Sequence, residues 1–205
     1  MDNHFDIQAK EWDNDPSKIE RAKIFADQIS GFIKQNNNLR ALEFGCGTGA
    51  LSFQLKDFFK TITLADSSQG MIDVLNAKIK QTGITNFFPL KIDEDNNIDT
   101  IGNFDVIYTS MTMHHVLDIE EVITKFNSIL TPKGYLCIAD LEKEDGSFHD
   151  QHPNFIGHNG FHKEELTTIL NRCGFVVEYY NVCFAVKKEL KEYPVFMMIC
   201  RKKDL

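Results

Sequence analysis

Three alternate glycines follow an apolar run in the segment Ala41 to Ala50, which reads ALEFGCGTGA. Glycine adopts positive φ without strain and lacks a Cβ, so this spacing predicts a tight turn where the backbone approaches a ligand closely. A second apolar run, Thr61 to Ala65, ends at Asp66, about 20 residues beyond the glycines, which is the usual separation in a β-α-β unit that binds a nucleotide. The chain is therefore predicted to hold a nucleotide-type cofactor at this bend.

Strand-like and helix-like segments alternate along most of the chain. After an N-terminal helix within 12–34 that starts at Pro16-Ser17, strands are predicted at 39–44, 61–65, 87–92, 104–109 and 134–141, and helices at 49–58, 68–81, 118–130 and 163–172. This alternation indicates right-handed crossovers and a mostly parallel sheet. Two last strands, near 174–186 and 194–201, are expected to be joined by a loop over 187–194. Since no helix separates them, they must pair antiparallel or exchange places in the sheet.

Size and charge narrow the class of protein. A chain of 205 residues fits one domain, and a net charge of -8 disfavours a surface that neutralises many phosphates, so no nucleic-acid partner is expected. The N-terminus lacks the basic and apolar regions of a signal peptide, and no apolar run is long enough to span a bilayer. The five cysteines are scattered and never form a Cys-x-x-Cys pair. We therefore expect a cytoplasmic protein that acts on small molecules, without a membrane partner.

Four stretches together resemble the Rossmann-like (class I) S-adenosylmethionine-dependent methyltransferases of the small-molecule type. They are Glu43 to Gly49, Asp66, Phe104 to His115 (FDVIYTSMTMHH) and Leu130 to Leu136 (LTPKGYL), and their order and spacing match from about residue 38 to 141. The resemblance implies a doubly wound α/β fold with a mostly parallel seven-stranded sheet whose last strand is reversed. It also implies one methyltransferase domain with three parts: an N-terminal helical lid (1–37), a cofactor-binding core (38–141) and a substrate loop, helix and terminal strand pair (142–205).

The resemblance implies S-adenosylmethionine as cofactor, S-adenosylhomocysteine as product, and a role for each matching residue. The glycines would line the methionine and ribose portions, Glu43 would help to fix the amino group through water, and Asp66 would accept the ribose hydroxyls. Met71 would pack on the adenine, and Asp93 would lie near its amino group. The full set of predicted cofactor-binding residues is Glu43, Gly45, Cys46, Gly47, Gly49, Asp66, Ser67, Met71, Asp93, Thr109, Ser110 and Met111, of which the last three would form the floor of the methyl-transfer pocket.

Six of the seven histidines lie between residues 114 and 162, a region expected at the carboxyl edge of the sheet. A neutral imidazole can accept a proton from a thiol, phenol or amine, so His114, His115 and His149 are the predicted catalytic residues. A wall that excludes water favours methyl transfer, and the candidate substrate-binding residues are Trp12, Met113, Phe148, His152 and Phe161.

The loop histidines also allow a metal interpretation. His149, His152, His158 and His162 offer four imidazoles, which zinc accepts as ligands. No cysteine accompanies them, their spacing matches no compact zinc motif, and the displacement chemistry needs no metal. The sequence therefore predicts no metal.

Other functions remain open at this stage. Gly45, Gly47 and Ala50 also satisfy the permissive fingerprint of an NAD(P)-dependent oxidoreductase, although Glu43, the additional Gly49 and the adjacent terminal strands favour the methyltransferase. A noncatalytic module that binds S-adenosylmethionine or S-adenosylhomocysteine would carry the same glycine loop. The sequence leaves the methyl acceptor open, as well as the choice between a monomer and a homodimer.

Overall fold

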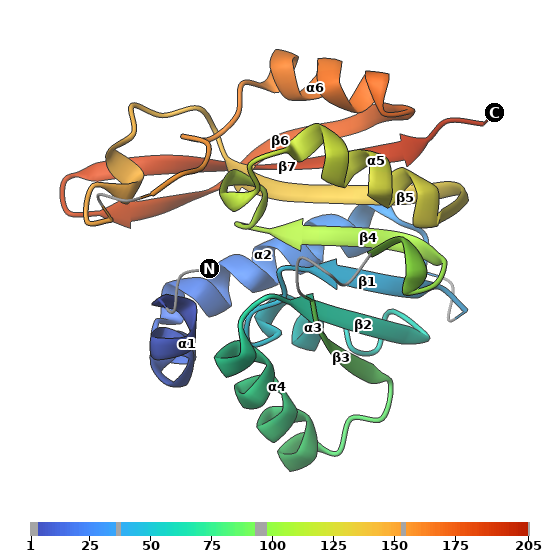
Figure 1. Cartoon of the computed structure of the whole chain (residues 1–205), viewed down its shortest axis with the longest axis horizontal. Helices are drawn as coiled ribbons and strands as arrows, with labels where there is room; N and C mark the ends of the chain where they lie inside the picture. The colour runs from blue at the N-terminus through green and yellow to red at the C-terminus, as the bar shows by residue number, and fades with distance from the viewer. Residues whose placement is uncertain (1–3, 36–37, 93–97, 153–154, 205) are drawn as a thin grey trace.

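Seven strands form one sheet in the order β3-β2-β1-β4-β5-β7-β6 (Figure 1). The computed structural model describes residues 4–35, 38–92, 98–152 and 155–204. The strands are β1 (Arg40–Phe44), β2 (Thr61–Asp66), β3 (Phe87–Lys91), β4 (Phe104–Ser110), β5 (Leu130–Leu141), β6 (Phe175–Lys188) and β7 (Lys191–Lys202).

Strands β1 to β5 pair with one another in parallel, and β7 is antiparallel to both β5 and β6. This arrangement confirms the predicted fold class, including the reversed last strand. The chain reverses its direction of travel across the sheet between β1 and β4. In open α/β sheets such a reversal opens a crevice at the carboxyl ends of the strands, where ligands bind.

Helices cover both faces of the sheet. The side chains of α2 (Pro16–Phe32), α3 (Ala50–Gln54) and α4 (Gln69–Thr82) join one apolar core, and those of α5 (Ile119–Ile129) and α6 (Lys163–Arg172) join the other. Helix α2 begins as predicted, because Asp15 caps it by accepting a hydrogen bond from Ser17 N at 2.9 Å and Pro16 fits the first turn. Two short elements, α1 (His4–Gln8) and η1 (Ala9–Asn14), precede α2. None of the helices in the described ranges combines the length and apolar character needed to cross a membrane.

The helix predicted over 49–58 is shorter in the structure and ends at Gln54. Leu55 N donates to Ser52 O at 3.0 Å and Phe58 N to Leu55 O at 2.9 Å, so tight turns replace the last helical turn. These turns place both Leu55 and Phe59 in the core, where each is almost fully buried. Burial of two large apolar side chains therefore outweighs the local preference for helix.

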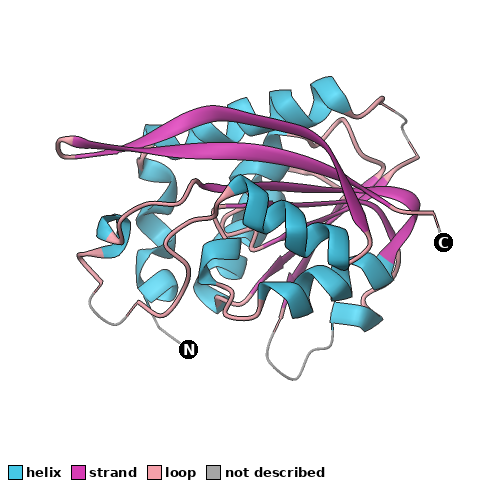
Figure 2. Cartoon of the chain, turned by 90° about the horizontal axis from the view of Figure 1, so that it is seen from above, coloured by secondary structure: helices cyan, strands magenta, loops and turns pink. Residues whose placement is uncertain are grey.

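The loop predicted over 187–194 was wrong. Strands β6 and β7 pair as far as Lys188 and Lys191, and only two residues form the turn. Strand β5 pairs with β7 only as far as Val195, so the end of the hairpin extends beyond the rest of the sheet (Figure 2). Leu190, at the tip, is fully exposed. The sequence around Lys187, Lys188 and Lys191 is typical of a solvated loop. In the structure the backbone of these lysines is paired between β6 and β7, and their side chains extend from the ribbon.

The second core gives a direct test of the packing. Phe126 on α5 is fully buried and lies edge-on to Phe44 at a centroid distance of 5.1 Å. We expect Phe126→Ala to lower the free energy of unfolding by about 3–5 kcal/mol, measured by urea denaturation, because it leaves a large cavity. Phe88→Ala is the control, since Phe88 is 51% exposed on β3, and it is expected to cost less than about 1 kcal/mol. Equal losses in the two variants would contradict the assignment of Phe126 to the core.

Candidate active site at the carboxyl edge of the sheet

The glycine loop lies between β1 and α3 and is tied to β2. Gly45, Gly47 and Gly49 all have positive φ, and the N–H groups of Gly45 and Cys46 both donate to Ala65 O, at 2.8 and 3.0 Å. A Cβ on Gly45 would collide with the side chain of Thr112, so this glycine lets the loop after β4 approach closely. A Cβ on Gly47 would lie 3.8 Å from Trp12 Nε1 and 3.9 Å from Met71 Sδ. These are ordinary contact distances, so the positive φ is what favours glycine at position 47.

Asp66 lies directly beside this loop. Its carboxylate accepts hydrogen bonds from Gly47 N at 2.6 Å and from Ser68 N at 2.8 Å. Burial raises the pKa of Asp66, and the backbone N–H donors oppose that effect. The structure thus brings the predicted ribose-binding carboxylate and the glycine loop into contact at one point.

Glu43 is buried beneath the loop. Its carboxyl accepts a hydrogen bond from Ser52 Oγ, which lies 2.6 Å from the Tyr108 hydroxyl. Burial raises the pKa of Glu43 to about 8, and it also raises the pKa of the neighbouring Cys46 thiol well above its ordinary value. In this structure Glu43 links β1 to α3, and its predicted contact with a cofactor amino group stays a prediction.

The N-terminal segment lies across the glycine loop. Asp6 accepts hydrogen bonds from Ser68 Oγ at 2.5 Å and from Gly70 N at 2.8 Å. Asp13 accepts from Thr48 Oγ1 at 2.6 Å and from Lys78 Nζ at 2.7 Å. Figure 1 shows α1 beside α4, as these contacts require.

Neither Asp6 nor Asp13 was predicted as a site residue, because acidic residues in a polar N-terminal segment look like solvated surface until their partners are known. Trp12, between them, lies near Gly47 and under the Lys18 ammonium, which is 3.4 Å from the ring centroid. The N-terminal segment therefore covers the loop, with aspartates as its attachment points.

The other predicted cofactor-binding residues differ in how deeply they are buried around the glycine loop. Met71 is almost fully buried below Gly47, whereas Ser67 is exposed. The Thr109 hydroxyl is buried and has no hydrogen-bond partner within the described residues, and Met111 has a positive φ and donates its N–H to Ala139 O at 2.8 Å. Ser110 is partly buried, and Asp93 lies outside the described residues.

Three histidines and one aspartate meet at the ends of β4 and β5. His114 Nδ1 lies 2.6 Å from Asp140 Oδ1, and both residues are buried. The ring centroids of His115 and His149 lie 4.2 and 5.2 Å from that of His114, and 5.4 Å from each other. Loss of hydration and the neighbouring imidazoles lower the pKa of His115 to about 3 and that of His149 to about 4. These two rings are therefore neutral at physiological pH.

The structure does not bring together the four loop histidines, His149, His152, His158 and His162, that the sequence offered as possible metal ligands. Only His149 joins His114 and His115. His152 is exposed and contacts His4 at a centroid distance of 4.4 Å, His158 Nε2 lies 3.3 Å from Leu117 O, and His162 precedes α6. The four loop histidines therefore do not converge on one point.

Asp140 was missed by the sequence analysis, although its signal was present. It is the single acidic residue within the apolar run that forms β5, and it ends at the same edge as the cofactor residues. A fully buried carboxylate in such a run needs a partner, and His114 supplies one.

Of the predicted substrate-binding residues, two lie in an apolar core and one lies against the histidine cluster. Met113 and Phe161 are buried in the core that α5 and α6 cover. Phe148 is buried and lies edge-on to His149 at 4.8 Å, and Phe155 stacks on His149 with a centroid distance of 3.7 Å. His149 is thus held between two aromatic rings.

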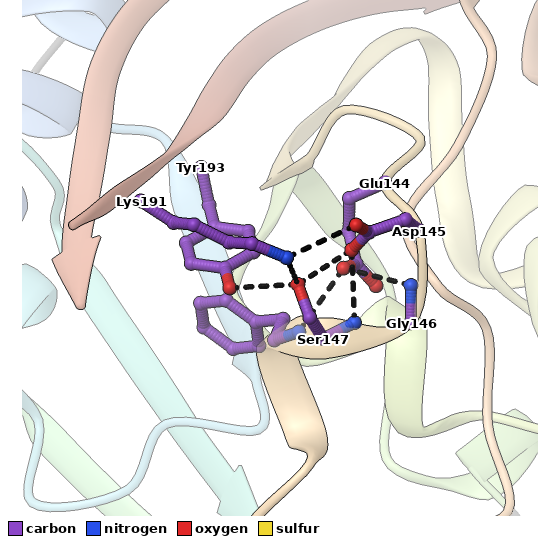
Figure 3. A network of polar contacts seen from close by, with 7 residues as sticks. Glu144, Asp145, Gly146, Ser147, Lys191 and Tyr193 are labelled. Atoms are coloured by element: carbon purple, nitrogen blue, oxygen red, sulfur yellow. Dashed lines mark hydrogen bonds and ion pairs between the residues drawn. The ribbon is translucent and has the colours of Figure 1, made fainter. Parts of the chain in front are cut away.

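The hairpin of β6 and β7 anchors the segment that carries His149. Within η4 (Ser147–His149) the Ser147 hydroxyl lies 2.9 Å from the Tyr193 hydroxyl, and Lys191 Nζ lies 2.7 Å from Ser147 Oγ and 3.0 Å from Asp145 Oδ2 (Figure 3). Glu144 Oε2 accepts from Gly146 N at 2.9 Å and from Phe148 N at 3.0 Å. The polar stretch after β5 is therefore fixed to the hairpin by side chains.

Comparison with known proteins assigns this chain and its fold to one class. A family model described as a methyltransferase domain matches residues 18–180. An uncharacterized methyltransferase of Schizosaccharomyces pombe is 34% identical over 155 residues, which cover 69% of this chain and 54% of that protein. Another from Oceanobacillus iheyensis is 30% identical over 177 residues, 83% of this chain and 76% of that protein. An S-adenosylmethionine-dependent methyltransferase structure from Clostridium acetobutylicum matches with a TM-score of 0.68 at 15% identity, covering 90% of this chain and 92% of that chain.

The chain therefore belongs to the methyltransferase domain family and has the fold of the class I S-adenosylmethionine-dependent enzymes. This confirms the family expected from the sequence and decides against the NAD(P)-dependent oxidoreductase. The chain spans about half the length of the Schizosaccharomyces pombe relative.

The buried carboxyl of Glu43 predicts a specific pH dependence of stability. Its folded pKa of about 8 lies above the ordinary value of 4.5, so the folded state holds this proton more tightly than the unfolded chain does. The associated stability is complete below about pH 4.5 and is lost as the pH rises through about 8. Between about pH 5 and pH 8 we expect the wild type to lose more unfolding free energy than Glu43→Gln, by on the order of a few kcal/mol.

Denaturant unfolding at several pH values measures this difference. Glu165→Gln is the matched control, because Glu165 is exposed on α6 and should leave the pH profile unchanged. Parallel profiles for wild type and Glu43→Gln would contradict the raised pKa.

Proposed function

We propose that this protein transfers a methyl group from S-adenosylmethionine to a nucleophilic atom of a small molecule. The observation that carries the proposal is the arrangement of two unlike groups at one sheet edge. The glycine loop with Asp66 follows β1 and β2, and the cluster of His114, His115 and His149 follows β4 and β5. A cofactor side and an acceptor side therefore meet at the reversal between β1 and β4.

The residues on the first side fit the nucleoside cofactor. Gly47 lies between the side chains of Trp12 and Met71, and an adenosyl group needs contacts with large side chains of this kind. An ionised carboxylate has about four lone-pair sites, so Asp66 can keep its backbone donors and also accept from a ribose diol. We propose the whole predicted set as cofactor contacts, with Gly47 and Asp66 as its centre.

The cofactor, when bound, supplies an electrophilic methyl on a sulfonium. The chain then has to hold the acceptor atom in line with that methyl and keep water away, and orientation of this kind supplies much of the rate. The N-terminal segment covers the cofactor side through Asp6 and Asp13, and Phe5 lies edge-on to His115 at 5.4 Å. We propose that the acceptor binds beneath this cover, against His114, His115 and His149.

The neutral rings of His115 and His149 give the acceptor side its chemistry. A hydroxyl, thiol or ammonium acceptor must lose its proton before or during methyl transfer, and these unprotonated imidazoles offer lone pairs that can accept it. Trp12, Phe148 and His152 border this region, and we propose them as contacts for the acceptor.

We also propose a cytoplasmic location, supported by five cysteines that are all unpaired. Cell fractionation tests this location, and recovery of the protein in an oxidising compartment would overturn it.

Transfer of label tests the reaction itself. Purified protein is incubated with methyl-labelled S-adenosylmethionine and panels of small phenols, thiols and amines, and labelled product is expected from at least one class. Cofactor binding without transfer to any panel would instead favour a noncatalytic S-adenosylmethionine-binding module.

The ribose contact gives a quantitative prediction. Asp66→Ala is expected to weaken S-adenosylmethionine binding by about 1–3 kcal/mol, roughly 5- to 150-fold in Kd, since it removes a charged hydrogen-bond acceptor. Isothermal titration calorimetry measures the change, and the thermal midpoint checks that the variant is folded.

Asp73→Ala is the control for Asp66, because Asp73 is exposed on α4 and accepts a hydrogen bond from the nearby Gln69 side chain. Its Kd should equal that of the wild type. An unchanged Kd for folded Asp66→Ala would remove Asp66 from the cofactor site.

A further inference from the structure

Three imidazoles come together at the histidine cluster, whereas a general base requires only one. One nitrogen of each of His114, His115 and His149 lies within 4.8 Å of the nitrogens of the other two. The sequence separates His149 from the other two by the whole of α5 and β5, so the fold itself brings the rings together. Three imidazole nitrogens at this spacing are suited to share one electron-pair acceptor.

Asp140 sets the direction of the first ring. It accepts a hydrogen bond from His114 N at 3.3 Å and lies 2.6 Å from His114 Nδ1, so the carboxylate occupies that side of the ring. His114 Nε2, on the other side of the ring, is the nitrogen left for another ligand. A carboxylate behind a histidine in this way is the usual support of a histidine that binds a metal.

His149 supplies a second, independent observation. Its side chain is buried, and its Nδ1 has no hydrogen-bond partner in the parts of the chain that the structure describes. A buried polar atom without a partner is costly unless something satisfies it. Stacking on Phe155 and the anchoring of η4 to the hairpin hold the ring in this position, so it does not turn to solvent.

We propose that His114, His115 and His149 together bind one divalent transition-metal ion of the zinc class. Zinc–nitrogen bonds of about 2.0–2.1 Å in a tetrahedron require nitrogens about 3.4 Å apart, which small side-chain rotations reach from the present spacing. Imidazole is a preferred ligand of zinc and of its neighbours in the transition series. Three protein ligands leave a fourth position, and the exposed ring of His115 places it on the open side of the cluster.

The fourth coordination position gives the metal a role in methyl transfer. This role rests on the proposed function. With their lone pairs on the metal, the three imidazoles position the acceptor in place of taking its proton. A hydroxyl or thiol of the acceptor binds at the fourth position through oxygen or sulfur and releases its proton to solvent, because a metal ion lowers the pKa of its ligand. The freed electron pair forms the bond to the methyl carbon, and the carbon–sulfur bond of the sulfonium breaks to leave the neutral thioether.

Metal titration without S-adenosylmethionine tests the site separately from the methyltransferase proposal. The full chain is stripped with a chelator, dialysed and titrated with Zn²⁺ by calorimetry and with Co²⁺ by visible absorption. We expect one equivalent per chain and the intense absorption of four-coordinate Co²⁺. His115→Ala and His149→Ala should each weaken binding at least about 10-fold, and Asp140→Asn about 10- to 100-fold.

His158→Ala and His162→Ala are matched controls, since both histidines lie on the same segment but outside the cluster, and they should bind metal as the wild type does. His115 is exposed, so its variant is expected to fold even where His149→Ala does not. Failure of the wild type to bind either ion, or equal losses in the control variants, would overturn the proposal. Metal binding without any methyl transfer would leave this site intact and count against the proposed function alone.

Discussion

The structure depends on the reversal of strand order between β1 and β4. Strands β1 and β4 pair in parallel, so the loops that follow them lie at the same edge of the sheet. There the Thr112 side chain occupies the space that a Cβ on Gly45 would need. Hydrogen bonds from the glycine loop to Ala65 O then fix that loop to β2. Close backbone approach at this one point therefore determines where both halves of the site lie.

The terminal hairpin serves the site as much as the sheet. Its inner part covers the edge of β5, and its outer part, beyond Val195, holds η4 through Lys191 and Tyr193. Lys188 adds a hydrogen bond of 2.6 Å to Phe148 O and lies 3.8 Å from the centroid of the Phe148 ring. The extended ribbon thus positions His149, although no residue of the hairpin belongs to the histidine cluster.

Sequence patterns predicted the parts of this molecule that local chemistry controls. Glycine spacing, apolar periodicity and the capped start of α2 at Pro16 led to the fold. The position of Asp66 beside the glycine loop was predictable because its separation from the glycines is set by one β-α-β unit. The partners of Asp6, Asp13 and Asp140 could not be read in this way, since each contact joins segments far apart in the chain. The hairpin was misjudged for a related reason, because its lysines are satisfied by tertiary contacts.

One short element closes both sides of the site. Asp6 and Phe5 are adjacent in α1, yet Asp6 binds Ser68 beside the glycine loop and Phe5 lies edge-on to His115 of the histidine cluster. A helix of only five residues that contacts both groups cannot cover one without the other. Under the proposed function this matters, because methyl transfer from a sulfonium requires that water be excluded from donor and acceptor together. Asp6 is exposed, and exposed polar contacts are individually weak, which suits a cover that opens to admit ligands.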